Sequence, residues 1–108
     1  MTYSMSCFRN DVVLLPIPFT DLSSRKVRPA VVIGRNGVDL FLVPISSQLA
    51  NTDFPLREWQ AAGLNVNCGI KAQIATVEER LVVKIVGKLS AVDVQTLNNH
   101  LRNWLQLS

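Results

Sequence analysis

The chain is poor in the residues on which many catalytic sites depend. Its 108 residues include one histidine, two cysteines and 18% charged residues, against roughly 25% in typical soluble domains. The single histidine, His100, excludes a mechanism with paired histidines and argues against a Ser-His-Asp triad. Cys7 and Cys68 form no CxxC pair and have no histidine cluster nearby, so we expect no zinc site. Motifs for phosphate loops or metal ligands are also missing, and we expect neither a metal nor a cofactor.

Long apolar runs and targeting segments are lacking as well. The longest apolar run, Val12–Phe19, is far short of the ~18 residues that a membrane span needs and contains two prolines. The N-terminus has neither the basic start nor the apolar core of a signal peptide. With only two thiols, these features predict a cytoplasmic protein with reduced cysteines and no membrane attachment.

What is present is one small domain, over residues 1–108, with many apolar residues. Hydrophobic residues make up 48% of the sequence, enough for a single modest core. A domain with so little charge is expected to cover part of its apolar surface with a partner, and a homodimer does this most simply. The net charge of +3 permits nucleic-acid binding without showing it.

The order of apolar runs and turn signals predicts a mainly β domain. Runs rich in Val and Ile that end at Pro or Gly are typical of strands, and Asn36-Gly37 is the signal of a tight hairpin. Arg57–Ala62 is expected to form a helical turn that Gly63 ends. The expected strands are Asp11–Pro18, Pro29–Gly34, Asp39–Pro44, Phe54–Leu56 as a short edge strand, Cys68–Thr76 and Leu81–Leu89.

The C-terminal segment predicts an amphipathic helix that packs on the sheet or barrel. Ser90 followed by Asp93 resembles a capping box, with the serine as N-cap and an acid in the first turn. Apolar residues then recur at helical spacing on one side of the helix. They are Val94, Leu97, Leu101, Trp104 and Leu105.

Three cations between the first two strands indicate a site for an anion, with a phosphate chain as the best match. They are Arg25, Lys26 and Arg28. Arg28 is the strongest candidate because Pro29 keeps the chain extended there, and a guanidinium binds phosphate through two parallel hydrogen bonds. A solvated or structurally paired arginine fits the residue chemistry equally well. Ser46 and Ser47 follow the third strand, where two serines by themselves are most often turn formers.

Several segments, in one order, resemble the PemK/MazF-like toxins of bacterial toxin–antitoxin pairs. Arg9–Ile33 is similar to the family's opening, in which a strand runs into a "PFTD" loop and then an Arg-Pro strand. Val43–Gln48, VPISSQ, is similar to the family's "PITSQ" segment. Each motif alone is weak, but the ordered set, which spans Asp11–Leu107, is specific. The further matches are EWQAAGL at Glu58–Leu64, QIATVEERL at Gln73–Leu81 and VGKLS at Val86–Ser90.

The resemblance implies a small SH3-like β-barrel with a C-terminal helix, acting as a homodimer. It implies a metal-independent endoribonuclease that cuts single-stranded RNA by attack of a 2′-hydroxyl on the adjacent phosphate, and a cognate antitoxin as partner. Arg28 matches the family's catalytic arginine and Ser46 its catalytic threonine. Arg28 would then stabilise the phosphorane or assist proton transfer, and Ser46 would bind a non-bridging oxygen. The RNA-binding residues would be Arg25, Lys26, Ser47, Gln48 and Lys71.

The chain departs from the family pattern at three places. The usual Gly-Asp is Asn10-Asp11, which a turn tolerates, and the catalytic threonine is a serine. The "DQIRT" of several active members reads AQIAT, so an acid and an arginine are missing at Ala72 and Ala75. Lys71 is the nearest candidate to replace them.

Three function hypotheses follow, from different classes. The first is a ribonuclease toxin. The second is a nucleic-acid-binding barrel that has lost catalysis because of Ala72 and Ala75. The third is a protein-interaction module, in which the low charge reflects only a dimer interface.

Overall fold

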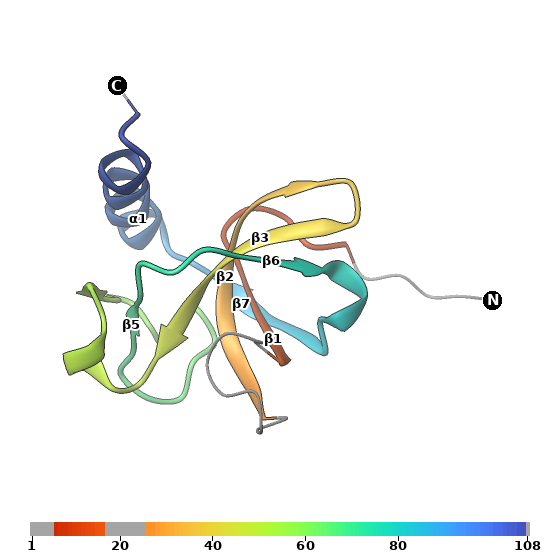
Figure 1. Cartoon of the computed structure of the whole chain (residues 1–108). Coiled ribbons are helices and arrows are strands. Elements are labelled where there is room, and N and C mark those ends of the chain that lie inside the picture. Colours follow the sequence, from red (N-terminus) through yellow and green to blue (C-terminus); the bar gives the residue numbers. More distant parts are fainter. Residues whose placement is uncertain (1–5, 17–25, 108) are drawn as a thin grey trace.

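The structure is a computed structural model that describes residues 6–16 and 26–107 of the chain. These residues form seven β-strands, all paired antiparallel, and one helix near the C-terminus (Figure 1). Two short 3-10 turns, η1 (Leu49–Asn51) and η2 (Glu79–Leu81), connect some of the strands. The other elements are β1 (Asp11–Pro16), β2 (Val27–Asn36), β3 (Asp39–Ser46), β4 (Phe54–Pro55), β5 (Gly69–Ile70), β6 (Ala75–Glu78), β7 (Lys84–Lys88) and α1 (Ala91–Leu105).

The strands make one curled sheet with β3 at its centre. Their order is β4-β5-β3-β2-β1-β7, and β6 pairs with β3 beside this path. The first half of β3 pairs with β6 and its second half with β5. Asn36 and Asp39 close the β2–β3 hairpin, and Gly37 has the positive φ of 63° that the Asn-Gly signal predicts. The mainly β fold with a C-terminal helix is thus confirmed, with the SH3-like barrel present as a curled, open sheet.

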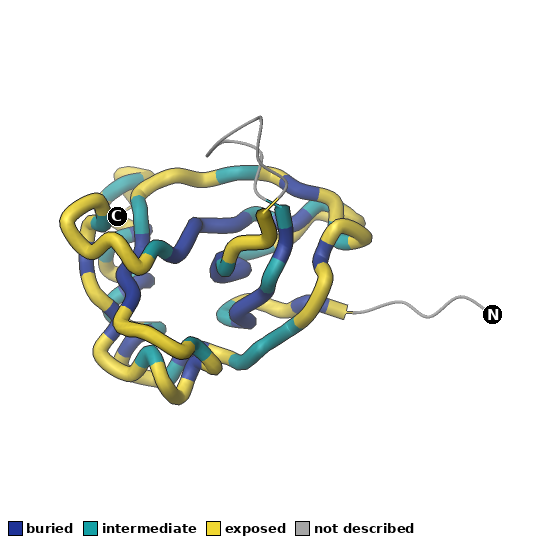
Figure 2. Tube along the Cα trace, turned by 90° about the horizontal axis from the view of Figure 1, so that it is seen from below, coloured by how far each residue is buried: buried dark blue, intermediate teal, exposed yellow. Residues whose placement is uncertain are grey.

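Buried side chains form two clusters, one on each face of the sheet. Successive strand residues point to opposite faces, so Val12 joins the cluster under α1 and Val13 joins the other. Leu97 and Leu101 of α1 complete the first cluster, as the helical periodicity predicts. Leu105, expected in the same apolar stripe, is exposed instead. Figure 2 shows buried segments on the central strands and exposed ones on the loops around them.

The continuous strand expected at Cys68–Thr76 is wrong, because the chain divides there into β5 and β6. Residues 71–74 leave the sheet between these two strands. Ile70 pairs with Ile45 of β3 and Ala75 pairs with Leu42. Only Val43 and Pro44 of β3 therefore lie opposite the four residues 71–74, and continuous pairing is not possible. Pro44 also has no N–H to donate to a neighbouring strand.

The remaining strands are confirmed with shifted ends. β2 and β3 extend beyond the expected Pro29–Gly34 and Asp39–Pro44, and β4 is the expected short strand. β7 is shorter than Leu81–Leu89 because that range begins within η2. The first strand is confirmed as far as Pro16, and residues 17–18 lie outside the described part of the chain. No helix in the described ranges is long and apolar enough to cross a membrane.

The helical turn expected at Arg57–Ala62 is present and is bound to the start of α1. Gly63 ends the turn with a φ of 87°. Ser90 is the N-cap of α1, and its hydroxyl accepts the backbone N–H of Asp93 at 3.4 Å. The fully buried carboxylate of Asp93 reaches further and accepts the N–H groups of Arg57 and Glu58, both at 2.9 Å. Asp93 therefore ties the first turn of α1 to a turn that is distant in the sequence.

An ion pair between Arg35 and Glu79 lies beside Cys7, which belongs to the core cluster on the face of the sheet away from α1. The Arg35 guanidinium lies 2.9 Å from the Glu79 carboxylate and also donates to the backbone oxygens of Cys7 and Gly37. The same carboxylate accepts the backbone N–H of Cys7 at 2.8 Å. Burial, with the nearby carboxylates, raises the pKa of the Cys7 thiol to about 11, so it stays protonated at neutral pH. The pair thus ties the N-terminal segment to β2 and η2.

The Arg35–Glu79 pair should make stability depend on pH on the acid side. The hydrogen bonds from Arg35 and from the Cys7 backbone lower the pKa of Glu79 below its ordinary value of 4.5. A carboxyl whose pKa is lower in the folded state stabilises the fold above the unfolded pKa, and this contribution disappears as the pH falls through the folded pKa. Urea unfolding should therefore show wild type more stable than Glu79→Gln at pH 7, with the difference shrinking below pH 4.5. A difference independent of pH would contradict this role.

Candidate nucleic-acid interface

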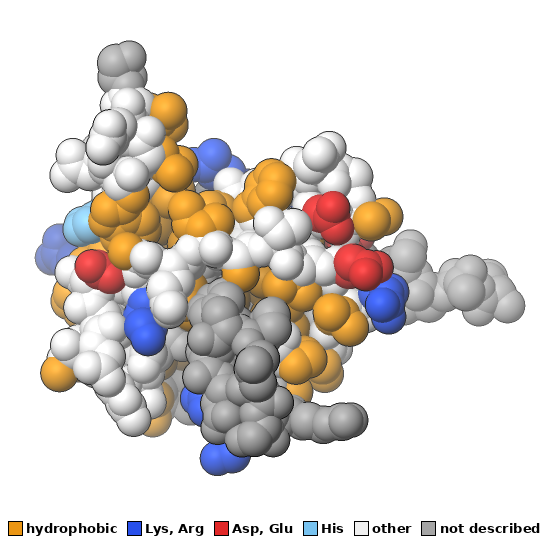
Figure 3. Space-filling view, viewed as in Figure 1, with side chains coloured by type: hydrophobic (Ala, Val, Ile, Leu, Met, Phe, Trp, Pro, Cys, Tyr) orange, Lys and Arg blue, Asp and Glu red, His pale blue; other side chains and the backbone are white. Residues whose placement is uncertain are grey.

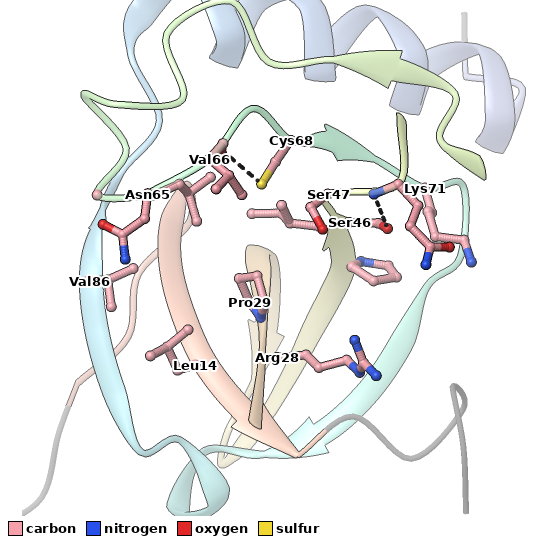
Figure 4. Close-up of a pocket in the computed structure, with 15 residues that line it drawn as sticks. Leu14, Arg28, Pro29, Ser46, Ser47, Asn65, Val66, Cys68, Lys71 and Val86 are labelled. Carbon is pink, nitrogen blue, oxygen red and sulfur yellow. Dashed lines mark hydrogen bonds between the residues drawn. The ribbon is translucent and has the colours of Figure 1, made fainter. Parts of the chain in front are cut away.

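One cavity of about 500 Å³ opens where the pairing between β2 and β3 ends. Its size lies within the ~300–1,000 Å³ typical of small-ligand sites. Figure 4 shows side chains from β1, β2, β3, β7 and the two loops around β5 converging on it. The lining residues are Leu14, Arg28, Pro29, Pro44, Ile45, Ser46, Ser47, Gln48, Gly63, Leu64, Asn65, Val66, Cys68, Lys71 and Val86.

The strand register brings Arg28 and Ser46 to the same side of this cavity. Ala30 pairs with Pro44 at the last recorded rung between β2 and β3. Two residues further along each strand are Arg28 and Ser46, and there the strands have separated: Arg28 pairs with Leu15 of β1 and Ser46 with Gly69 of β5. Figure 4 shows both with Lys71 on one side of the cavity. The two residues predicted to be catalytic thus line the same cavity, although 18 positions separate them in the sequence.

The Arg28 guanidinium is exposed and available to a ligand. Within the described residues no side chain or backbone group is hydrogen-bonded or ion-paired to it. The described cavity wall also contains no Asp or Glu. No described residue of the cavity wall therefore neutralises the charges of Arg28 and Lys71, so an anion is the ligand that these residues favour.

The turn after β3 fixes the hydroxyl of Ser46. Its Oγ accepts the backbone N–H of Gln48 at 3.1 Å, so the Ser46 O–H is left to donate. The Gln48 side-chain oxygen accepts the Asn51 amide at 2.9 Å, which ties Gln48 to η1. Ser47 is exposed and also lines the cavity. All three members of the predicted Ser46–Gln48 segment therefore reach the site.

Lys71 is held at the cavity by its own backbone and by an acid from another loop. Its N–H donates to the Pro44 oxygen at 3.1 Å, just before Ser46. The next residue, Ala72, donates its N–H to the Asp53 carboxylate at 2.6 Å. The Asp53 carboxylate thus lies beside the backbone of Ala72, the position at which the family pattern has an acid. It holds the loop that carries Lys71. Asp53 was missed by sequence reasoning because only the fold brings the two loops together.

Two positions named in the sequence analysis, Lys26 and Ala75, do not line this cavity. Lys26 is exposed just before β2 and is not among the lining residues. Arg25 lies outside the described residues. Ala75, on β6, pairs with Leu42 of β3 and packs against the core cluster that contains Val13. Position 75 therefore faces the protein interior rather than the cavity.

Sequence reasoning missed the wall opposite Arg28. Leu14, Val66 and Val86 form much of it, with Asn65 at its rim (Figure 4). The apolar members read as ordinary core positions, so no local signal marked them.

Cys68 also lines the cavity but lacks the character of a nucleophile. Its Sγ lies 3.2 Å from the Val66 oxygen, to which the thiol donates. Burial raises the pKa of the Cys68 thiol above its ordinary value. A thiol with a raised pKa stays protonated at neutral pH and is unreactive.

Comparisons with known proteins agree with the fold. A mycobacterial endoribonuclease, solved in complex with its cognate antitoxin, superposes with a TM-score of 0.69 and 14% identity, covering 94% of this chain and 95% of that one. The toxin MazF-mt6 of Mycobacterium tuberculosis superposes with a TM-score of 0.70 and 15% identity, covering 91% and 98%. A search of curated proteins finds no match. At such low identity the two structures show the fold alone.

The family follows from the sequence as a whole. A sequence model described as the PemK-like, MazF-like toxin of type II toxin–antitoxin systems matches residues 8–105, which include every strand, the helix and all the residues that line the cavity. The chain therefore belongs to the PemK-like, MazF-like family of type II toxins.

Proposed function

We propose that this toxin is an endoribonuclease that cuts single-stranded RNA at the cavity beside Arg28. The observation that carries the proposal is that Arg28, Ser46 and Lys71 line one cavity whose described lining residues include no Asp or Glu. Such a cavity selects a phosphate and offers donors to its oxygens. The structural neighbour described as an endoribonuclease in complex with its cognate antitoxin supports the same conclusion.

The residues suggest how the phosphate is activated. When the 2′-hydroxyl of RNA attacks the adjacent phosphate, negative charge grows on the non-bridging oxygens. The Arg28 guanidinium and the Lys71 ammonium would offset this charge, and the free O–H of Ser46 would donate to one oxygen. Ser47 and Gln48, on the same turn, would hold the RNA backbone. The nucleophile belongs to the RNA: its 2′-oxygen loses a proton and bonds to phosphorus, the bond from phosphorus to the 5′-oxygen breaks, and that oxygen takes up a proton. These side chains would position the phosphate and offset its charge during the exchange.

The decisive test is RNA cleavage in the presence of EDTA. The purified protein should cut single-stranded RNA and leave a 2′,3′-cyclic phosphate or a 3′-phosphate, because the nucleophile is the neighbouring 2′-hydroxyl. Mass spectrometry of the fragments identifies these ends. RNA whose 2′-hydroxyl at the cut site is replaced by hydrogen should remain intact. RNA that is bound but never cut would contradict the proposal and favour a barrel that only binds nucleic acid.

Ser46 should matter through its hydroxyl. Ser46→Ala should lower kcat by at least about tenfold, since loss of one donor to a developing oxyanion costs up to ~10²–10³-fold. Ser46→Thr should keep most of the activity because it keeps the hydroxyl. Thr76→Ala removes an exposed hydroxyl on β6, away from the cavity, and should cut RNA like wild type. Equal loss in Ser46→Ala and Ser46→Thr would rule out the hydroxyl as the important group.

The proposed partner is an acidic, partly disordered antitoxin that acts in the cytoplasm. A cavity with unneutralised cations attracts such a segment, which would fold as it binds. Expression of the toxin alone should stop bacterial growth, and co-expression of the small protein encoded next to it should restore growth. Harmless expression of the wild-type toxin would argue against this arrangement.

We also propose that the toxin acts as a homodimer. Several large apolar side chains are exposed on the single chain, including Val38, Val83 and Leu107. Figure 3 shows hydrophobic side chains gathered where α1 meets the sheet. Light scattering at micromolar concentration should give about twice the chain mass of 12.0 kDa. A mass of one chain would contradict the dimer.

A further inference from the structure

The cavity has two chemically different sides. Arg28 and Ser46 lie on one side, and the aliphatic side chains of Leu14, Val66 and Val86 face them from the other (Figure 4). A site for phosphate alone gains nothing from an aliphatic wall, since phosphate is fully charged. A nucleotide has both characters, because ribose joins its charged phosphate to a base with flat, apolar faces. The whole cavity therefore matches a phosphate with its attached nucleoside better than it matches a phosphate alone.

Asn65 is the polar group on the aliphatic side. It lies at the rim beside Val86 and is exposed (Figure 4). Among the residues that the structure describes, none is hydrogen-bonded to its side chain. An amide offers a donor and an acceptor side by side, which is the pattern on the edge of a nucleobase. Asn65 is thus placed to bind the edge of a base whose faces contact the aliphatic wall.

Close backbone packing holds Asn65 in this place. A Cβ on Gly63 would collide with the Val86 carbonyl, and a Cβ on Gly87 would collide with the Ala62 carbonyl. The turn before Asn65 therefore lies directly against β7, at a distance that only glycine permits. Residues that read a ligand need such rigid support, because a loosely held side chain discriminates poorly.

We propose that the aliphatic side is a subsite for one nucleobase next to the cleaved phosphate, and that Asn65 determines which base it accepts. This inference rests on the ribonuclease function proposed above. Single-stranded RNA is usually read through splayed bases, by contacts with their faces and hydrogen bonds to their edges. With a phosphate at Arg28, an attached base remains inside the same cavity and reaches Val86 and Asn65.

The test measures base preference at the two nucleotides that flank the cut. Short RNAs with each of the four bases at each position give a set of kcat/KM values for wild type and for Asn65→Ala. Wild type should prefer one base at one position by about tenfold or more, the discrimination expected of a paired donor and acceptor. Asn65→Ala should bring that ratio close to one, mainly by slowing the best RNA. Asn65→Asp replaces the donor with an acceptor and should change the order of preference.

Two controls separate the base subsite from a general defect. Asn67→Ala removes an exposed amide from the same loop, outside the cavity lining, and should keep the wild-type preference. A substrate that lacks the base but keeps its ribose 2′-hydroxyl should be cut equally by wild type and Asn65→Ala. Unchanged base ratios in Asn65→Ala, with RNA still cut, would overturn the subsite alone. Failure of wild type to cut any of the RNAs would overturn the ribonuclease function itself.

Discussion

Arg28→Ala should lower the rate of RNA cleavage by at least ~10²-fold, the usual cost of removing one donor that stabilises transition-state charge. The guanidinium is exposed, unpaired within the described residues and lines the same cavity as Ser46. Its removal therefore leaves no buried group without a partner, and the free energy of unfolding should change by less than about 0.5 kcal/mol. Activity and stability should respond independently, which is the mark of a residue that acts on the substrate.

The comparison with Arg28→Lys tests what the arginine supplies. Lysine keeps the charge but loses the planar fork that donates two parallel hydrogen bonds, so cleavage should be intermediate. Arg80→Ala is the matched control: Arg80 is also exposed, but it is ion-paired to Glu78 and lies outside the cavity lining. Single-turnover cleavage of one RNA compares all three variants. Robust cleavage by Arg28→Ala would remove Arg28 from the mechanism.

Much of the fold could be predicted because local signals agree with the tertiary structure. The Asn36-Gly37 turn, the β-branched strands and the capped helix each need only a few neighbouring residues. Asn10 shows how far such reasoning extends. It replaces the family's usual glycine and has a φ of 77°, a conformation in which asparagine is among the best tolerated non-glycine residues. The expectation that this turn accepts asparagine is therefore confirmed.

Local reasoning failed where a partner strand determines the structure. Nothing in Cys68–Thr76 itself interrupts a strand. The break between β5 and β6 arises because Val43 and Pro44 are too few to face residues 71–74. Strand propensity describes one segment, whereas register depends on two.

The candidate site also contains residues that the sequence predicts and residues that only the fold brings together. Arg28 and Ser46 could be found from the order of the motifs. The register between β2 and β3 explains why both reach the same cavity. The aliphatic wall could not be found, since Leu14 and Val86 have the appearance of ordinary strand residues. Asp53 was missed for a related reason: its carboxylate acts at position 72, and a contact across 19 positions has no sequence signature.

Asp93 has a role that its sequence position predicts and another that only the fold reveals. Its replacement by alanine should give the largest loss of stability among the proposed variants. Its position predicts a helix cap, but its main contacts are the N–H groups of Arg57 and Glu58, more than 30 positions away. Asp93→Ala should leave both N–H groups without their partner in a partly buried place. At about 1–3 kcal/mol for each unsatisfied group, the free energy of unfolding should fall by about 3 kcal/mol or more.

Urea unfolding separates this role of Asp93 from simple capping. Ser90→Ala removes only the N-cap hydroxyl and should cost about 1 kcal/mol. Asp93→Asn keeps one acceptor oxygen for two donors, so its loss should fall between those of Ser90→Ala and Asp93→Ala. The turn that Asp93 holds leads through Gly63 to Asn65, so partial loosening should weaken base preference before the protein unfolds. If Asp93→Ala cost no more than Ser90→Ala, the bond between α1 and the turn would contribute little, and Asn65 would depend on the Gly63–β7 packing alone.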